Sequence, residues 1–380
     1  MRLLFITQSL VHGGAERHAV TLANRLAERG HECHFAYVKD DSSQLSRLRG
    51  IASVNGLGAH KYLDLEALQR LGALVSSIRP THVIAANEYA LFYAWLATRR
   101  SSAKLVVIFH STVPHTLKRR LQMLYYRPLF WSADWLVFVC EAQARYWRRR
   151  QLTARRTEVI YNGVDTEHFR PDETQRARLR RVLGFAEDEV VIGLSAVLRP
   201  EKNPLALLDA CALARRRGVA ARALFIGDGP MRGAIEAHAA RLGFARELLV
   251  TGFQQDVRPL VLACDAIALC STTETFSLAA LEALALGRPV LHAALGGAAE
   301  MIEPGSNGFL FPSGDTEAFA ERIAALADAQ ARAAMGVRAR RDVEARFSER
   351  AMVERYENGL QELLTARSKR GNLRRPASAH

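Results

Sequence analysis

The chain has 380 residues, of which 49% are apolar and 24% are charged, and it carries a net charge of +13. This length favours two domains, each large enough to bury its own core. No apolar run reaches the roughly 18 residues that span a bilayer, and the opening apolar stretch is too short for a signal peptide. Five scattered cysteines without C-x-x-C spacing argue against a disulfide framework and against zinc, so we expect a cytoplasmic protein.

Short apolar runs alternate with longer amphipathic stretches along the whole chain. The first half contains six predicted strands: 3–7, 32–38, 82–87, 104–110, 135–140 and 158–163. The second half contains six more: 189–197, 221–229, 248–253, 266–271, 289–294 and 308–313. Strands rich in Val, Ile, Leu and Phe, separated by amphipathic helices, are typical of parallel sheets covered on both faces. The sequence therefore predicts an α/β protein with two Rossmann-like, doubly wound domains.

The two series of strands meet near 169–189, where a charged stretch interrupts the alternation. We predict an N-terminal domain over 1–170 and a C-terminal domain over 171–347. A helix over 348–366 follows, and the basic tail 367–380 is expected to be disordered. Because ligands of open α/β sheets bind beyond the carboxyl ends of the strands, we expect the site to lie in a cleft between the domains.

Two features follow predicted strands in the first half. Gly13 and Gly14 come after the first strand and before a helix, where free amides stabilise an anion. A tight turn without a ligand is the alternative for these glycines. His110 closes an apolar strand at an edge where ligands bind. The alternative for His110 is a structural histidine that is satisfied by its neighbours.

A basic turn follows the first strand of the second half. Arg199 and Lys202 stand just before the next helix. Two cations at such a turn suit a pyrophosphate, which Arg holds with a planar fork and Lys holds as a point charge. A solvated basic turn is the alternative. The run "FIGDGPMR" makes a further turn after a strand, and a capping role for Asp228 in this turn is the alternative to a functional one.

The stretch "TETFSLAALEALALGRPV" combines two acids with a mostly apolar helix. Ser277 is the predicted N-cap of this helix, and the free amides of its first turn attract a phosphate. Glu274 projects from the preceding loop and Glu282 from inside the helix, one on each side of the anion. Carboxylates accept hydrogen bonds from vicinal hydroxyls, as sugars and ribose require. A salt bridge to a neighbouring basic residue is the alternative for Glu282.

Taken together, these motifs resemble the family-4 retaining glycosyltransferases, which use nucleotide sugars and have the GT-B fold. The resemblance covers nearly the whole chain. Its motifs, in the family's order, are "GGAERH", "VIYNGVDTEHFRP", "RPEKN", "IGDGP", "TGFQQDV", "TETFSLAALEALALGRPV" and "GGAAEMIEPGSNGFLFPSGD". The resemblance implies that the N-terminal domain mainly binds the acceptor and the C-terminal domain mainly binds the donor. It also implies that the last helix crosses back to the first domain.

The resemblance assigns roles within the E-x7-E signature. Glu274 matches the first Glu, which lies at the donor sugar, and Glu282 matches the second, which holds the ribose hydroxyls. We therefore expect Glu282 to be partly open at the floor of the cleft. Where the family often has Gly after the first Glu, this chain has Thr275, which would narrow the sugar pocket or add a hydroxyl contact.

The remaining roles fall on the turns after the strands. Lys202, with Arg199, would neutralise the departing diphosphate, although the family's usual Arg position is Val197 here. His110 matches the histidine beside the transferred sugar. The implied catalytic residues are Glu274, His110, Lys202 and Arg199. The implied donor-binding residues are Gly13, Gly14, Arg199, Lys202, Gly252, Phe253, Glu274, Thr275, Phe276, Ser277, Leu278 and Glu282.

The implied reaction is hexosyl transfer with retention, by front-face attack in which the leaving diphosphate helps to deprotonate the acceptor. No D-x-D stands at a strand end, so we expect no metal, and the nucleoside-diphosphate sugar serves as co-substrate with no other cofactor. One alternative is a nucleotide-sugar epimerase, but the E-x7-E signature argues against it. The other is a non-catalytic homologue that binds a sugar nucleotide, which stays open because Val197 replaces the family's usual Arg. A nucleic-acid partner is not expected, because no RNA-binding or helix-turn-helix motif appears.

The positive charge concentrates in one region, 99–160, which holds thirteen Lys or Arg residues against three acids. Within it, 117–131 mixes cations with leucines and aromatics, and 145–156 adds further arginines. Such a mixture fits an anionic membrane surface, as a segment of 117–156 lying on the inner face of the cytoplasmic membrane. A lipid-linked or lipopolysaccharide-type glycan acceptor would explain the patch. The alternative is an internal helix whose arginines face solvent.

Overall fold

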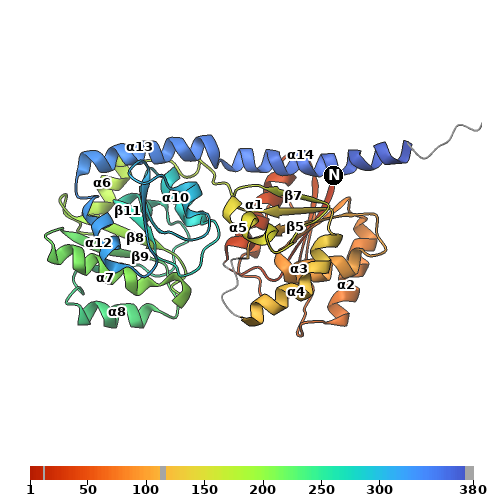
Figure 1. Cartoon of the computed structure of the whole chain (residues 1–380), viewed down its shortest axis with the longest axis horizontal. Helices are drawn as coiled ribbons and strands as arrows, with labels where there is room; N and C mark the ends of the chain where they lie inside the picture. Colours follow the sequence, from red (N-terminus) through yellow and green to blue (C-terminus); the bar gives the residue numbers. More distant parts are fainter. Residues whose placement is uncertain (12, 112–116, 373–380) are drawn as a thin grey trace, which may run out of the picture. The chain divides into compact units, whose positions relative to one another are not determined.

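The computed structural model describes residues 1–11, 13–111 and 117–372. The chain forms two compact units (Figure 1): unit 1 comprises Met1–Tyr161 with Ala351–His380, and unit 2 comprises Asn162–Arg350. The chain therefore passes into the second unit at Asn162, earlier than the boundary that the sequence suggested at residue 170.

Unit 1 contains a seven-stranded, wholly parallel sheet in the order β3-β2-β1-β4-β5-β6-β7. Its strands are β1 Arg2–Thr7, β2 Glu32–Tyr37, β3 Ser53–Gly56, β4 His82–Ala86, β5 Lys104–Phe109, β6 Trp135–Phe138 and β7 Arg156–Val159. The sequence predicts six of these strands. It misses β3 because the four residues SVNG include one large apolar side chain and resemble a loop.

Helices lie on both faces of this sheet, as a doubly wound fold requires (Figure 1). They are α1 Gly14–Glu28, α2 Leu65–Ile78, α3 Asn87–Thr98, α4 Leu117–Ser132, α5 Glu141–Arg148 and the short η1 Leu45–Arg47, together with α14 Glu349–Asn372. The helices α2, α3 and α4 pack side by side on one face. Apolar side chains from the strands and from these helices form one continuous core.

The last helix, α14, packs on unit 1 against the sheet. Gly359 lies so close to the Trp135 ring that a Cβ at this position would stand 2.7 Å from Cζ2. Only glycine therefore allows the helix to approach the ring this closely. The helix continues to Asn372, past the point where we expected the basic tail to begin, and residues 373–380 lie outside the described part of the chain.

Unit 2 contains a six-stranded parallel sheet in the order β10-β9-β8-β11-β12-β13. Its strands are β8 Val190–Ser195, β9 Ala221–Ile226, β10 Leu248–Val250, β11 Ala266–Leu269, β12 Val290–Ala293 and β13 Gly308–Phe311. Its helices are α6 Glu173–Val182, η2 Pro200–Lys202, α7 Pro204–Arg216, α8 Arg232–Arg241, α9 Arg258–Ala263, α10 Leu278–Ala285, α11 Ala298–Met301, α12 Thr316–Ala324 and α13 Ala329–Arg346.

Both sheets confirm the predicted doubly wound parallel architecture. In each sheet the strand order reverses next to the first strand, between β1 and β4 in unit 1 and between β8 and β11 in unit 2. Ligands of such sheets bind beyond the carboxyl ends of the strands at this switch point. A ligand of this fold is therefore expected to contact the residues that follow β1, β4, β5, β8 and β11.

Candidate active site

In unit 2 the structure brings Lys202 and Glu274 together at the switch point. Lys202 ends η2, after β8, and Glu274 lies in the loop after β11. Lys202 Nζ donates a hydrogen bond of 2.9 Å to Glu274 Oε2. The lysine side chain is 32% exposed and the glutamate side chain 16%. The pair is thus partly shielded from water, so its Coulomb interaction is less screened than that of a surface ion pair.

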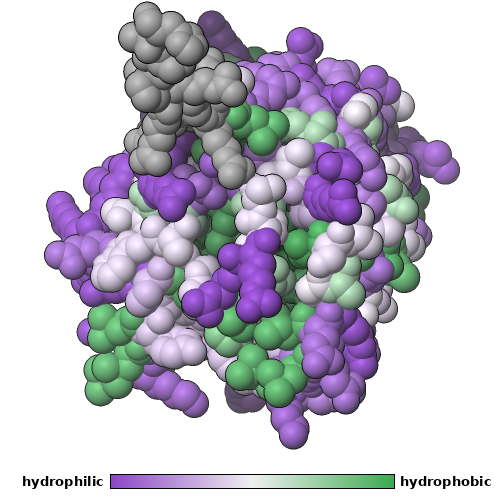
Figure 2. Space-filling model, turned by 90° about the vertical axis from the view of Figure 1, so that its right-hand side faces the viewer, coloured by the Kyte–Doolittle hydropathy of each residue, from purple (hydrophilic) through white to green (hydrophobic). Residues whose placement is uncertain are grey.

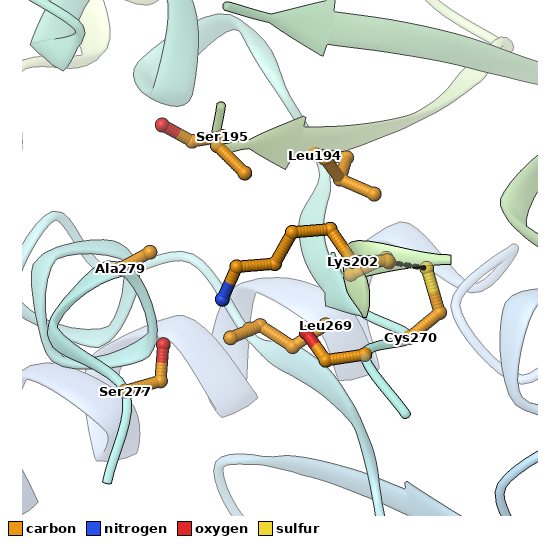
Figure 3. Close-up of a pocket in the computed structure, with 10 residues that line it drawn as sticks. Leu194, Ser195, Lys202, Leu269, Cys270, Ser277 and Ala279 are labelled. Atoms are coloured by element: carbon orange, nitrogen blue, oxygen red, sulfur yellow. Dashed lines mark hydrogen bonds between the residues drawn. The ribbon is translucent and has the colours of Figure 1, made fainter. Parts of the chain in front are cut away.

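A hollow of about 250 Å³, partly open to solvent, lies beside this pair. Its walls are the carboxyl ends of β8 and β11, with Lys202 and the start of α10; the lining residues are Leu194, Ser195, Ala196, Lys202, Ala268, Leu269, Cys270, Ser271, Ser277 and Ala279. Figure 3 shows Lys202 extending across the hollow towards Ser277 and Ala279. Cys270 Sγ donates to the Lys202 carbonyl oxygen at 3.5 Å, which holds the backbone of the lysine against β11.

The predicted N-cap of α10 is confirmed. Ser277 has extended backbone angles, and its Oγ accepts from Ala280 N at 3.3 Å. The first-turn amides ahead of Ala280 have no partner within the helix, so they remain available to an anion in the hollow. Leu278, the first residue of the helix, is half-buried.

Glu282 lies one turn inside α10 and is 4% exposed. We expected this side chain to be partly open at the floor of a cleft, and in the structure it is buried. The reason is that α10 is surrounded by its own unit: Ala280, Leu281, Ala283 and Leu284 are buried as well.

The loop that carries Glu274 is fixed from two sides. Phe276 turns its ring into the core against Phe347, with ring centroids 5.5 Å apart, and its carbonyl oxygen accepts from Asn162 Nδ2 at 3.0 Å. The carbonyl oxygen of Thr275 accepts from Gly297 N at 2.8 Å. The side chain of Thr275 is itself buried. The loop is therefore held in place by the hydrogen bonds of its backbone and by the packing of the Phe276 ring.

Gly229 packs closely against the turn between β8 and η2. Gly229 approaches this turn so closely that a Cβ would stand 2.6 Å from the Leu198 carbonyl oxygen. Leu198 N in turn donates to Asp228 O at 2.9 Å. Arg199 follows this turn as an exposed residue and lies outside the lining of the hollow.

Gly252 and Phe253 follow β10 beside the same glycine-rich turn. Gly252 forms an isolated antiparallel bridge with Gly227 and has a φ of 71°, which favours glycine. Phe253 is 67% exposed. Neither residue belongs to the lining of the hollow described above.

In unit 1 the two predicted glycines begin α1. Gly13 is the N-cap residue, and its carbonyl oxygen accepts from Arg17 N at 3.0 Å. A Cβ on Gly13 would collide with the carboxylate of Glu16. An anion at this helix start would thus have to share the space with the Glu16 carboxylate.

His110 directly follows β5, as predicted, and is half-buried. Its backbone N donates to Asn87 Oδ1 at 2.7 Å, and its ring meets the buried His18 ring with centroids 4.8 Å apart. Burial, and next the neighbouring His18, lower the pKa of His110 well below its usual range. The imidazole is therefore neutral at physiological pH and can both accept and donate a hydrogen bond.

Three residues around His110 escaped sequence reasoning: Asn87, Gln143 and His18. Asn87 has a φ of 68°, an uncommon value for a residue other than glycine. An Asn-Glu pair at the end of the apolar run 82–86 was the available signal, since asparagine tolerates the left-handed region. Gln143 and His18 stand inside helices, where nothing in the local pattern distinguishes them.

The region 117–131 forms α4, which is apolar on two sides. Met123, Tyr126, Leu129 and Phe130 are buried against the core. Outward-facing residues form a second apolar row: Leu117, Leu121, Leu124, Tyr125 and Trp131 are 72, 56, 49, 62 and 50% exposed. Within the described residues, no helix combines the length and the apolar character that crossing a bilayer requires.

Two family models match the chain. Glycosyltransferase Family 4 matches residues 12–168, and Glycosyl transferases group 1 matches residues 175–342. The two matches follow one another along the chain and fall mainly on unit 1 and unit 2, respectively.

Relatives and solved structures agree with these matches. The putative glycosyltransferase EpsD of Bacillus subtilis is 32% identical over 209 residues, 54% of this chain, and the chain spans only about half (55%) of that protein. The N-acetyl-alpha-D-glucosaminyl L-malate synthase of Bacillus anthracis is 28% identical over 363 residues, which cover 91% of this chain and 93% of the synthase. Anabaena HepE in complex with UDP-glucose has a TM-score of 0.84 at 25% identity and covers 96% of this chain and 100% of its own. The chain belongs to family 4 of the glycosyltransferases and has the GT-B fold.

Proposed function

We propose that the protein is a retaining glycosyltransferase of the hexosyltransferase type, which moves a sugar from a nucleoside-diphosphate sugar to a glycan or glycolipid acceptor in cell-surface polysaccharide or lipopolysaccharide-type biosynthesis. The observation that carries this proposal is Lys202, which is paired with Glu274 and extends across the hollow towards the start of α10 (Figure 3). A cation and a helix N-terminus suit a diphosphate, and an adjacent carboxylate suits sugar hydroxyls.

The reaction exchanges one bond of the anomeric carbon. Its bond to the diphosphate oxygen breaks, a bond to the acceptor oxygen forms on the same face, and the acceptor proton passes to a diphosphate oxygen. Lys202 and the first-turn amides of α10 stabilise the negative charge that develops on the diphosphate. Glu274 orients the sugar, and the neutral His110, which the resemblance matches to the histidine beside the transferred sugar, exchanges hydrogen bonds with a sugar hydroxyl. Arg199, exposed beside η2, adds long-range positive charge.

Nucleotide binding tests the donor site directly. UDP-glucose is the first donor to test, because HepE, which is similar to this chain over almost its whole length, was crystallised with it. We expect UDP or GDP, and one of their sugars, to raise the melting temperature and to bind in calorimetry, and we expect Lys202→Ala to weaken both effects. Exposed Arg246→Ala, at the amino-terminal edge of the same sheet, serves as the matched control. Absence of any stabilisation by nucleoside diphosphates would refute the donor site.

Product analysis separates the remaining candidates. Retention predicts that the transferred sugar keeps the anomeric configuration of the donor, which NMR of the product reads out, and an inverted product contradicts the proposed mechanism. Conversion of one nucleotide sugar into another without an acceptor would indicate an epimerase. Tight nucleotide binding without any turnover would indicate a non-catalytic homologue.

We further propose that the enzyme is cytoplasmic and attaches peripherally to the inner face of the membrane through α4. The exposed apolar row of this helix is accompanied by Lys118, Arg120 and Arg127, and Trp131 Nε1 donates to Gln151 O, beside Arg148–Arg150. Each cation near an anionic leaflet contributes about 1 kcal/mol. Leucines and aromatics with cations are the composition of interfacial helices.

The loop before α2 widens this surface. Tyr62 and Leu63 in this loop are 48 and 47% exposed, and Leu65, the first residue of α2, is 66% exposed. The Tyr62 hydroxyl is hydrogen-bonded to that of Tyr126 on α4. Figure 2 looks onto one side of the molecule and shows hydrophobic groups gathered in its lower half among hydrophilic ones. The sequence did not predict that this loop lies next to α4, because that contact depends on how α2 and α3 pack.

Liposome flotation tests the attachment. We expect binding to vesicles with anionic lipid, little binding to zwitterionic ones, and loss of binding in Leu121→Glu/Tyr125→Glu. Val337→Glu is the control, because Val337 is a 72% exposed apolar residue on α13. Equal flotation with both kinds of vesicle, or equal loss in the control, contradicts the proposal.

A further inference from the structure

The backbone around His110 is held by side chains from two neighbouring strand ends. The first is Gln143, on α5 after β6. Gln143 Nε2 donates to Phe109 O at 2.8 Å and to Ser111 O at 3.0 Å, the two carbonyls that flank His110. Gln143 Oε1 accepts from Val139 N at 3.0 Å. One amide group therefore ties the end of β5 to the end of β6 with three hydrogen bonds.

The second set of contacts comes from β4, on the other side of β5. Asn87 Oδ1 accepts from His110 N at 2.7 Å, and Glu88 Oε2 accepts from Ser111 Oγ at 2.9 Å. Asn87 keeps its left-handed φ of 68° while making this contact. Backbone strain of this kind persists only where the surroundings over-determine it, and it concentrates at functional sites.

Gln143 is 4% exposed and uses both its amide hydrogens and its oxygen. A leucine has a similar volume and would fill the same space without polar atoms to satisfy. The amide is therefore needed for its three hydrogen bonds to backbone groups, and its volume alone is not the reason for it. Besides satisfying these groups, the bonds to Phe109 O and Ser111 O fix the path of the chain from which the His110 side chain projects.

We propose that Gln143 is a positioning residue that acts through His110, and this inference rests on the proposed function of His110 beside the transferred sugar. Catalytic groups must be held within about 0.5 Å of their productive geometry by surrounding hydrogen bonds. Gln143 supplies this constraint to the backbone from β6, Asn87 supplies it from β4, and the His18 ring packs against the imidazole itself.

The test compares Gln143→Leu with a matched control, Asn307→Leu in unit 2. Asn307 is also a buried amide with three hydrogen bonds: Nδ2 donates to Met301 O and Asp342 Oδ2, and Oδ1 accepts from Glu303 N. Both variants lose the same kind of network and are expected to lower the melting temperature. We expect only Gln143→Leu to lower kcat, by between about 10-fold and 100-fold, because a misplacement of about 1 Å has an effect of this size. The Kd for the nucleoside diphosphate, which unit 2 holds, is expected to stay within about twofold for Gln143→Leu.

A double mutant decides whether Gln143 acts through His110. In a His110→Ala background, Gln143→Leu is expected to cause no further loss of kcat, because there is no imidazole left to position. An equal loss in both backgrounds, or an equal loss of kcat in Asn307→Leu, overturns the proposal.

A readout that needs no turnover separates this inference from the proposed function. The ring proton resonance of His110, assigned through His110→Ala, is expected to shift in Gln143→Leu and to stay in place in Asn307→Leu. If transfer activity is absent in the wild type but the resonance shifts as expected, the proposed function fails and the positioning role stands. An unshifted resonance overturns the positioning role whatever the activity.

Discussion

Gly296 supports the loop that carries Glu274, and an alanine there should damage the site from outside it. Gly296 has a φ of 54°, in the left-handed region. A Cβ at this position would stand 2.7 Å from Thr275 O and closer still to Glu274 O. Since both contacts are to backbone, no flexible side chain can move aside, and the loop itself has to shift.

The chain offers a control that separates backbone strain from collision. Gly305 has a φ of 78°, and a Cβ there would meet nothing within 4 Å. The left-handed conformation lowers the stability of each alanine variant by about 1 kcal/mol. Gly296→Ala adds the overlap with the loop, for which about 1 to 3 kcal/mol is the usual effect of inserting an atom into a packed place. We expect Gly296→Ala to lower the free energy of unfolding by about 2 to 4 kcal/mol, and Gly305→Ala by about 1 kcal/mol.

The effect on catalysis follows from the same overlap. Relieving it moves the Glu274–Thr275 backbone by about 1 Å, a displacement that lowers rates by about 100-fold. Initial rates of sugar transfer, calorimetric binding of the nucleoside diphosphate and denaturant unfolding measure the three quantities. If Gly296→Ala and Gly305→Ala are equally active while both remain folded, the inference that Gly296 supports the site is refuted.

Three further predictions follow from the site. The resemblance implies that Glu282 holds the ribose hydroxyls and that Glu274 lies at the donor sugar. Glu282→Ala should therefore weaken the binding of any nucleoside diphosphate whatever its sugar, whereas Glu274→Ala should spare nucleotide binding and abolish transfer. Calorimetry with UDP and a transfer assay on both variants check this contrast, and the same defect in both would contradict it. Lys202→Met should raise the Kd for the diphosphate more at low salt than at high salt. The substitution removes a cation that lines the hollow and lies 2.9 Å from Glu274, and salt screens the attraction of this cation for the diphosphate. A Kd that is independent of salt in the wild type would contradict this role. Burial lowers the pKa of His18 from 6.5 to about 4. Between these pH values the unfolded chain binds one more proton than the folded chain, so the free energy of unfolding falls as the pH falls. His18→Phe should remove this loss of stability, which is on the order of 3 kcal/mol between pH 6.5 and 4, and unfolding curves with the same pH slope in both proteins would disprove it.

Much of the fold can be predicted from local patterns. The alternation of buried strands and amphipathic helices indicates two parallel sheets, because strands covered on both faces need apolar residues throughout and helices need only a stripe. The N-cap of α10 is equally local, since Ser277 and the helix it caps are neighbours in the sequence. The strand β3 is the exception, because its four residues draw their pairing from β2 and carry little apolar signal of their own.

The arrangement of the candidate site was decided by tertiary structure. Lys202 and Glu274 are 72 positions apart, and they meet because β8 and β11 are neighbours in the sheet although they are not consecutive in the chain. Gln143 and Asn87 reach the backbone around His110 for the same reason, each from a strand next to β5.

Periodicity and capping depend on residues within a few positions of each other, so the sequence by itself determined the two sheets, the helices that cover them and the turns at which a ligand can bind. The sequence carries no comparable signal for which strand ends become neighbours, how deeply α10 buries Glu282, or which side of α4 faces solvent. These depend on the order of strands and on the packing of helices over them, because contacts between distant residues form only when the whole sheet is assembled.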